Sequence, residues 1–242
     1  MSHSLPSHSI RKGLLRVGAA LAVVAVGSTS FAADHRDGPA VQVTEDIAAD
    51  INDVYAFMDA DKLILGMTVF PASASDSQFS DAVVYQFHVN KHTSVLTPSA
   101  GTTDVMCTFD AAGTTFQCWV EDQVYVTGPV GDEAGTLSAG DEIRVFAGPR
   151  RDPFFFNLAG FNAARGAVIM AANTMGALTF DAGGCPTNAP GGALRDLLTT
   201  PSANFFEGLN TLSIVIEADP TLFVDDTNNL ASVWASTNRL GN

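Results

Sequence analysis

Apolar and polar residues alternate along several short stretches of this chain, and turn-forming residues separate the stretches. Within residues 82–90, apolar Val83 and Phe87 would point to one face of a strand. Polar Gln86 and His88 would point to the other face. A period of two residues is typical of a β-strand with one buried face, so we expect such a strand here.

Other segments resemble strands in the same pattern or in their content of β-branched and aromatic residues. They lie at residues 54–57, 63–70, 123–127, 142–147, 212–216 and 231–237. Turn-forming residues separate them, and residues 50–53 are expected to form a polar turn that leads into the first strand. This series of short strands predicts an antiparallel β-sandwich or a barrel-like fold.

The composition changes after Pro153. Residues 157–178 contain many alanines and few β-branched residues, and their apolar residues recur near helical spacing. A second, short helix is expected at residues 192–198. We therefore expect a mainly β fold with a helical insertion, at the margin of the α+β class, as one domain over residues 33–242.

The segment 143–156 joins these two regions. It begins as a strand and is expected to break at residues 148–149. Arg150, Arg151 and Asp152 then precede three phenylalanines. Charges beside so much apolar surface are costly unless they are paired. Either Arg150 and Asp152 form an internal pair that orders the crossing, or the guanidinium groups bind a carboxylate or phosphate.

The first 32 residues have the pattern of a secretory signal peptide that is cut after Ala32. Arg11, Lys12 and Arg16 form a basic start, an apolar run over residues 17–27 follows, and small residues precede the cut. The apolar run is shorter than the roughly 20 residues that a membrane span needs. The sequence therefore predicts a periplasmic or secreted protein.

The charge of the chain excludes some partners. The leader carries three of the 12 Lys and Arg residues and none of the 26 Asp and Glu residues, so the mature chain would have a formal charge of −17. Such an acidic surface repels nucleic acid, and no later stretch is long and apolar enough to span a membrane. A small ligand, a protein partner and a divalent cation remain as partner classes.

Two of the three cysteines are expected to pair. Cys107 and Cys118 flank a hairpin signal at residues 108–117, and a tight turn in its middle would place them opposite each other. A cross-strand disulfide is predicted, because disulfides persist in an oxidising compartment. Cys185 is left over in a glycine–proline loop, as a free thiol, a ligand or half of an intermolecular disulfide.

Six segments together resemble the bacterial family called domain of unknown function 4331. They are residues 34–39, 50–57, 85–89, 145–155, 212–217 and 232–239. Their order and spacing match over nearly the whole mature chain, and GPRxDPFF with an N-terminal His-Arg pair is the most specific part. The resemblance implies an exported, mainly β protein and no established activity. The family usually starts Ser-Ser-His-Arg-Glu-Ala-Pro, whereas this chain has acidic residues on both sides of His35-Arg36.

Histidine and carboxylate residues suggest two metal sites. If Ala33 becomes the N-terminus, its amine, two amide nitrogens and His35 would wrap a square-planar Cu(II) or Ni(II) ion. Alternatively, a divalent cation such as Ca²⁺ or a small ligand would be held by His35 and three carboxylates, because Ca²⁺ prefers oxygen ligands. The carboxylates are those of Asp37, Asp50 and Asp53.

Each of these sites has a structural alternative. His35 would then pin the N-terminal segment through hydrogen bonds, and Asp50 would cap a turn. Asp53 would pair with Arg36 or Arg150.

Motifs of catalysis are sparse. His88 and His92 are four residues apart, but a strand and the lack of an adjacent Glu argue against zinc. The chain has no nucleophile elbow, P-loop or haem-attachment motif. A triad that depends on histidine would have to use His35, His88 or His92.

The leading hypothesis is an exported, non-catalytic protein that binds a ligand or a partner. The expected binding residues are His35, Arg36, Asp53, Arg150 and Asp152. One alternative is a metal-dependent enzyme or metal-handling protein that uses the histidine and nearby carboxylates, with a divalent metal ion as its cofactor. The other is a cell-surface structural subunit, in which Cys185 and the exposed loops would contact neighbouring subunits.

Overall fold

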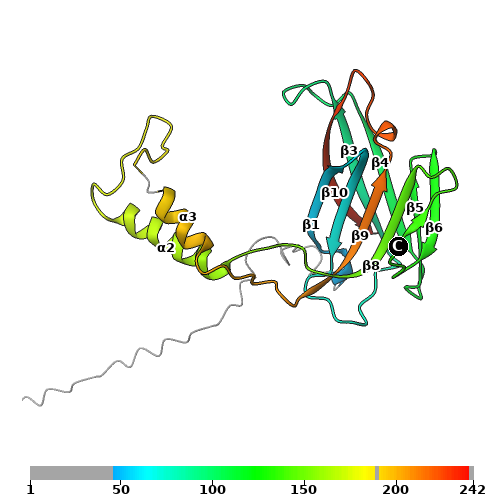
Figure 1. Ribbon diagram of the computed structural model, residues 1–242, viewed down its shortest axis with the longest axis horizontal. Helices are drawn as coiled ribbons and strands as arrows, with labels where there is room; N and C mark the ends of the chain where they lie inside the picture. The colour runs from blue at the N-terminus through cyan, green and yellow to red at the C-terminus, as the bar shows by residue number, and fades with distance from the viewer. Residues whose placement is uncertain (1–45, 189–190, 240–242) are drawn as a thin grey trace, which may run out of the picture. The chain divides into compact units, whose positions relative to one another are not determined.

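Two five-stranded antiparallel sheets form most of the structure, a computed structural model that describes residues 46–188 and 191–239 (Figure 1). The first sheet has the order β1 (Ile51–Asp59), β2 (Lys62–Val69), β9 (Asn210–Ala218), β8 (Ile143–Arg151) and β7 (Thr136–Leu137). The second has the order β10 (Leu230–Arg239), β3 (Val83–His92), β4 (Gly101–Phe109), β5 (Thr115–Val120) and β6 (Val124–Pro129). The sheets pack as a sandwich, which confirms the predicted fold class.

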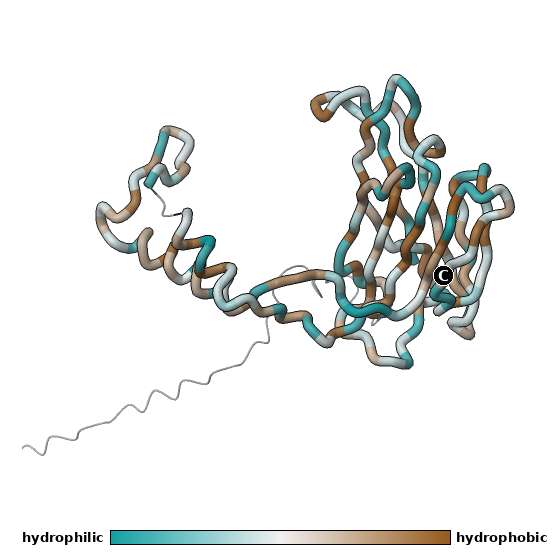
Figure 2. Tube along the Cα trace, in the orientation of Figure 1, coloured by the Kyte–Doolittle hydropathy of each residue, from teal (hydrophilic) through white to brown (hydrophobic). Residues whose placement is uncertain are grey.

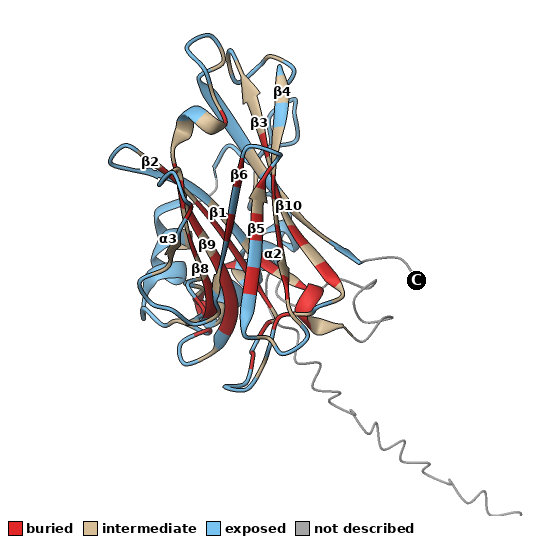
Figure 3. Ribbon diagram, turned by 90° about the vertical axis from the view of Figure 1, so that its right-hand side faces the viewer, coloured by how far each residue is buried: buried red, intermediate tan, exposed pale blue. Residues whose placement is uncertain are grey.

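The inward-facing residues of both sheets share one apolar core. Along β3, Val83, Tyr85, Phe87 and Val89 are fully buried while the residues between them are partly exposed, as the alternation predicted. Figure 2 shows this alternation of hydropathy along the strands, and Figure 3 shows that the buried residues concentrate in the sandwich. Each large apolar side chain buried in this way contributes roughly 1.5–3 kcal/mol.

The predicted helical insertion consists of α2 (Leu158–Asn173) and α3 (Gly191–Thr199), which lie between β8 and β9 in the chain. Asn157 connects them, because its side-chain oxygen accepts a hydrogen bond from the N–H of Gly160 at 3.0 Å. Its amide group donates to the carbonyl of Leu198 at 2.9 Å. No helix within residues 46–188 and 191–239 is long and apolar enough to cross a membrane.

The polar segment 50–53 is not the turn that the sequence predicted. Residues from Ile51 onward belong to β1, which follows the short helix η1 (Ile47–Ala49). The pairing with β2 shifts register between Ile51 and Asp53, so Asn52 is the extra residue of a β-bulge. A bulge admits polar residues without ending the strand, which is why the turn prediction was wrong.

The predicted break at Gly148 and Pro149 is also wrong. β8 continues through both residues to Arg151, paired with β9 throughout. Proline is tolerated because β7 pairs only with Arg144 and Val145, so the ladder on that side of β8 has already ended. The arginines of this segment therefore lie on a strand and not in a loop.

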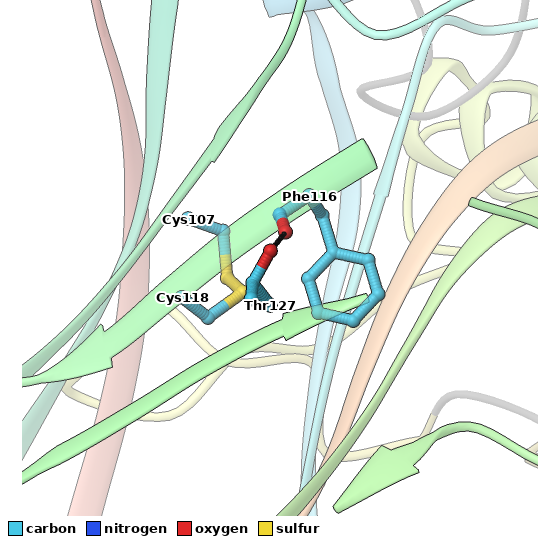
Figure 4. The surroundings of a disulfide bond; sticks show 4 residues. All are labelled: Cys107, Phe116, Cys118 and Thr127. Carbon is cyan, nitrogen blue, oxygen red and sulfur yellow. Dashed lines mark hydrogen bonds between the residues drawn. A yellow bond between two sulfur atoms is a disulfide. The ribbon is translucent and has the colours of Figure 1, made fainter. Parts of the chain in front are cut away.

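The predicted disulfide between Cys107 and Cys118 is confirmed (Figure 4). The two residues are directly opposite on β4 and β5, with their Cα atoms 4.2 Å apart. Beside them, the hydroxyl of Thr127 on β6 donates a hydrogen bond to the carbonyl of Phe116 at 2.8 Å. Cys185 is free and exposed. The predicted signal peptide lies outside the described residues.

Candidate functional site

A groove of about 310 Å³ lies on the outer face of the first sheet. The strand register places Tyr55, Gly66 and Val215 side by side on β1, β2 and β9. Gly66 forms the floor because it has no side chain, and a Cβ atom there would lie 3.4 Å from the Cβ of Tyr55. Phe57 and Ile64 extend the apolar lining along β1 and β2.

Arg150 lines one side of the groove and is held by two contacts. Its guanidinium makes a bidentate pair with the carboxylate of Glu133, at N–O distances of 2.9 and 2.8 Å. It also lies 3.6 Å from the centroid of the Phe146 ring. The expected pairing with Asp152 is therefore replaced, and the Asp152 carboxylate accepts a hydrogen bond from the N–H of Phe154 at 2.9 Å.

Arg151 is the available cation at this groove. Its side chain is exposed and lines both the groove and a neighbouring pocket of about 320 Å³. Within the described part of the chain its guanidinium makes no ion pair, in contrast to that of Arg150. A planar guanidinium presents five N–H donors that match the geometry of a carboxylate. The groove therefore combines apolar walls with a cationic rim.

Buried polar atoms without hydrogen-bond partners in the described part of the chain lie in the groove and in the adjacent bulge of β1. The hydroxyl of Thr68, a groove residue that is 3% exposed, has no hydrogen-bond partner among the described residues. Both side-chain amide atoms of Asn52, in the adjacent bulge and 1% exposed, also have none there. An unsatisfied buried group costs roughly 1–3 kcal/mol, so a polar ligand atom next to Thr68 would be stabilising.

Asp53 and Arg150, two of the predicted binding residues, lie at the same end of the first sheet. In the strand register, Asp53 on β1 lies opposite Thr68 on β2, and Thr68 lies opposite Ser213 on β9. Ser213 lies opposite Gly148 on β8, two residues before Arg150. Since neighbouring strands are about 4.8 Å apart, roughly 14 Å separates β1 from β8 at this row. The two residues therefore do not contact each other, and of the two only Arg150 lines the groove.

The remaining predicted site residues are either buried or outside the description. Asp50 and Asp152 are 4% and 8% exposed, and the backbone N–H of Asp152 donates to the carbonyl of Leu209 at 3.0 Å. His35, Arg36 and Asp37 lie outside the described residues, so the metal site built on them stays a prediction. Among the residues that the structure describes, no group of three His, Cys, Asp or Glu side chains is placed to hold a metal.

His88 and His92 lie on β3 but do not converge on one metal. The Nε2 atom of His88 is 2.9 Å from the hydroxyl of Ser236, and that of His92 is 2.9 Å from the hydroxyl of Ser232. Four residues along a strand span roughly 13 Å, whereas four along a helix bring side chains together.

Comparison of the chain with protein-family models, with curated proteins and with solved structures finds no match. The function of the groove therefore has to be inferred from its own residues.

Sequence reasoning singled out Arg150 but not the apolar residues of the groove. Tyr55, Gly66 and Val215 lie on three strands, and only the pairing of the strands brings them together. One signal was present, the glycine within the apolar run at residues 63–70. A glycine inside a strand often marks the close approach of a ligand or another backbone.

Proposed function

We propose that this protein is an exported binding protein whose groove holds an organic anion with an apolar body. The observation that carries the proposal is Arg151 at the rim of an apolar groove in a strongly acidic protein. The anionic group would bind the guanidinium, and the hydrocarbon would lie along Gly66 between Tyr55 and Val215. The hydroxyl of Thr68 would supply a further polar contact.

The dimensions and chemistry of the groove suit a small amphipathic molecule. A volume of about 310 Å³ is at the lower end of the range for small-molecule sites. Each methylene group buried in it would contribute roughly 0.8 kcal/mol. A charge-assisted hydrogen bond to Arg151 would contribute roughly 1.5–3 kcal/mol and would select an anion over a neutral molecule of the same length.

Export is proposed on two observations. The N-terminal sequence has the pattern of a cleaved signal peptide, and the buried Cys107–Cys118 disulfide is of a kind that persists in oxidising compartments such as the periplasm. Membership of the domain of unknown function 4331 family is proposed on the resemblance of six sequence segments, and it adds no activity.

The test is displacement of the fluorescent probe anilinonaphthalene sulfonate from the mature protein by decanoate and by decanol. We expect decanoate to displace the probe at a concentration at least about tenfold lower than decanol, because only decanoate can pair with Arg151. The variant Arg151→Gln should raise the Kd for decanoate about tenfold. Arg195→Gln, which removes an exposed arginine from α3, is the matched control and should leave the Kd unchanged.

Two outcomes would overturn the proposal. One is equal displacement by decanol and decanoate, which would show that charge is not recognised. The other is an equal effect of Arg151→Gln and Arg195→Gln, which would show that the anion responds to overall charge and not to the groove.

A further inference from the structure

A serine, a histidine and an aspartate form a continuous hydrogen-bonded chain on the outer face of the second sheet. The Oγ atom of Ser236 on β10 is 2.9 Å from Nε2 of His88 on β3. Nδ1 of His88 is 2.7 Å from Oδ1 of Asp104 on β4. The register brings them together, since His88 pairs with Asp104 on one side and with Trp234, two residues before Ser236, on the other.

The hydrogen bonds of this chain have one consistent direction. Both oxygens of Asp104 act as acceptors, because Oδ2 accepts from Nε2 of Gln86 at 2.7 Å. Nδ1–H of His88 therefore donates to Asp104, which leaves Nε2 of a neutral imidazole as the acceptor for the hydroxyl of Ser236. The Ser236 oxygen accepts in turn from Nδ2 of Asn238 at 3.0 Å. A serine hydroxyl aimed at a histidine that an aspartate orients is the arrangement of an activated nucleophile.

The surroundings hold the imidazole ring and leave the serine partly exposed. The Trp234 ring stacks on the His88 ring, with centroids 3.7 Å apart and planes 17° from parallel. The His88 side chain is only 13% exposed, whereas Trp234 is 51% exposed. Ser236 is partly exposed on β10, the edge strand of the sheet, and the exposed Trp234 precedes it by two residues on the same strand.

The same two strands carry a second serine–histidine pair that lacks the carboxylate. Nε2 of His92 is 2.9 Å from the hydroxyl of Ser232, and Nδ1 of His92 is 3.0 Å from the backbone carbonyl of Thr97. A neutral carbonyl stabilises an imidazolium less than a carboxylate does, because it carries no full charge. The molecule thus contains a matched control four residues away from Ser236.

We propose that Ser236 is the nucleophile of an acyl-transfer site, with His88 as general base and Asp104 as the residue that positions it. Attack of Oγ on an ester forms the bond to the acyl carbon, and the Oγ proton passes to Nε2 of His88. The bond between the acyl carbon and the alcohol oxygen then breaks, and the alcohol takes that proton. Water attacks the acyl-serine by the same route, which releases the carboxylic acid and restores Ser236.

The site selects aryl esters of small acids. The side chain of Asn238 donates to the Oγ atom of Ser236 itself, so it would have to turn toward the substrate to stabilise the oxygen that becomes negative. With so little stabilisation of the oxyanion, only a good leaving group such as a phenol is displaced readily. The exposed Trp234 ring offers an aromatic surface for that phenol beside Ser236.

The experiment treats the mature protein with para-nitrophenyl acetate, quenches it in acid and maps the acetylated peptides by mass spectrometry. We expect acetyl on Ser236, and release of nitrophenol that falls at least about 100-fold in Ser236→Ala and in Asp104→Asn. Ser232→Ala should keep the rate within about twofold of the wild type, because its histidine lacks an aspartate. Thermal unfolding of each variant confirms that it folds.

Mapping of the acetyl group on the wild-type protein keeps the test decisive if a variant is unstable. Acetylation of Ser232 and Ser236 to the same extent, or of neither, would overturn the proposal. An unchanged rate of nitrophenol release in Asp104→Asn would also overturn it. The contacts among Ser236, His88 and Asp104 would then be structural hydrogen bonds only. The groove of the first sheet is independent of this site, so neither proposal fails with the other.

Discussion

Cys107 and Cys118 face each other directly across β4 and β5, and the disulfide that joins them is buried in the core of the sandwich. The two residues are 11 positions apart, and closing a loop of that length lowers the entropy of the unfolded chain. By the loop-closure relation the stabilisation is roughly 3 kcal/mol. Within the second sheet, the bond thus links β5 to β4, the strand that also carries Asp104.

Replacing both cysteines by alanine should lower the free energy of unfolding by roughly 2–4 kcal/mol, because the unfolded chain regains that entropy. Urea denaturation of the oxidised protein and of the double variant measures the difference. Cys185→Ala is the control, and it should change the stability by less than about 0.5 kcal/mol because Cys185 is free and exposed. An equal effect of the control would mean that cysteine content, and not the bond, determines stability.

Tyr85 connects the core to the segment that precedes β1. Its hydroxyl donates to the carbonyl of Ala48 at 3.0 Å and accepts from the N–H of Ser80 at 3.0 Å. Tyr85→Phe leaves both backbone groups without this partner, so we expect a loss of roughly 1–3 kcal/mol in urea denaturation. Tyr125→Phe removes the hydroxyl of a half-exposed tyrosine and should cost less than about 0.5 kcal/mol.

The same tyrosine should also determine how the protein responds to alkali. Burial raises the pKa of Tyr85 above its ordinary value. Because the folded-state pKa is the higher one, this side chain stabilises the fold below about pH 10, and the stabilisation is lost as the pH rises above it. Stability measured from pH 9 to 11 should therefore fall less steeply in Tyr85→Phe than in the wild type. Parallel curves would contradict this.

Sequence patterns correctly predicted the elements whose structure is determined by residues close together in the chain. The alternation around Val83 and Phe87 predicted β3, because one face of that strand is buried and the other is not. The tight turn between Cys107 and Cys118 predicted their register for a similar reason, since hairpin geometry is set within a few residues. In both cases the decisive interactions lie between neighbours in the chain or across one turn.

The remaining features depend on partners that are distant in the sequence. Pro149 can stay in β8 because the pairing of β8 with β7 does not extend to it. Ser236 forms a hydrogen bond with His88, although the two residues are 148 positions apart. Arg150 pairs with Glu133 because β8 continues as a strand beyond the point where the sequence predicted a loop. No spacing rule contains this information, since it arises from sheet order and register.

Asp225 organises the turn before β10. Its carboxylate accepts hydrogen bonds from the N–H groups of Asn228 and Thr227, at 2.8 and 3.0 Å, and from Nζ of Lys91 at 3.0 Å. The bond from Asn228, followed by that from Lys91, lowers the pKa of Asp225 well below its ordinary range. Because the folded-state pKa is the lower one, this residue stabilises the fold above about pH 4 and loses that effect as the pH falls further.

Asp225→Asn keeps an acceptor oxygen but cannot titrate, so its stability should depend less on pH between about pH 4 and 2. Urea denaturation at several pH values in this window measures the slope. Asp226→Asn replaces the exposed neighbour and should retain the slope of the wild type. If both variants have the slope of the wild type, the turn of Asp225 does not contribute to acid sensitivity.

Gly66 allows binding and stability to be changed in opposite directions. A Cβ atom there would make an ordinary contact with Tyr55 at 3.4 Å, so Gly66→Val should fit and should raise the unfolding free energy by roughly 0.5–1 kcal/mol in this strand. The added methyl groups would occupy the floor of the groove. The Kd for decanoate should therefore rise at least about tenfold although the protein is more stable.

Gly166→Ala is the matched control for this substitution. Gly166 lies inside α2, and a Cβ atom added to it would meet nothing within 4 Å, so alanine should raise stability by up to about 1 kcal/mol through helix propensity. It should leave the Kd for decanoate unchanged because it is not part of the groove. A weaker affinity in both variants would show that stiffening of the chain, and not filling of the floor, reduces binding. An unchanged affinity in Gly66→Val would mean that the anion binds elsewhere.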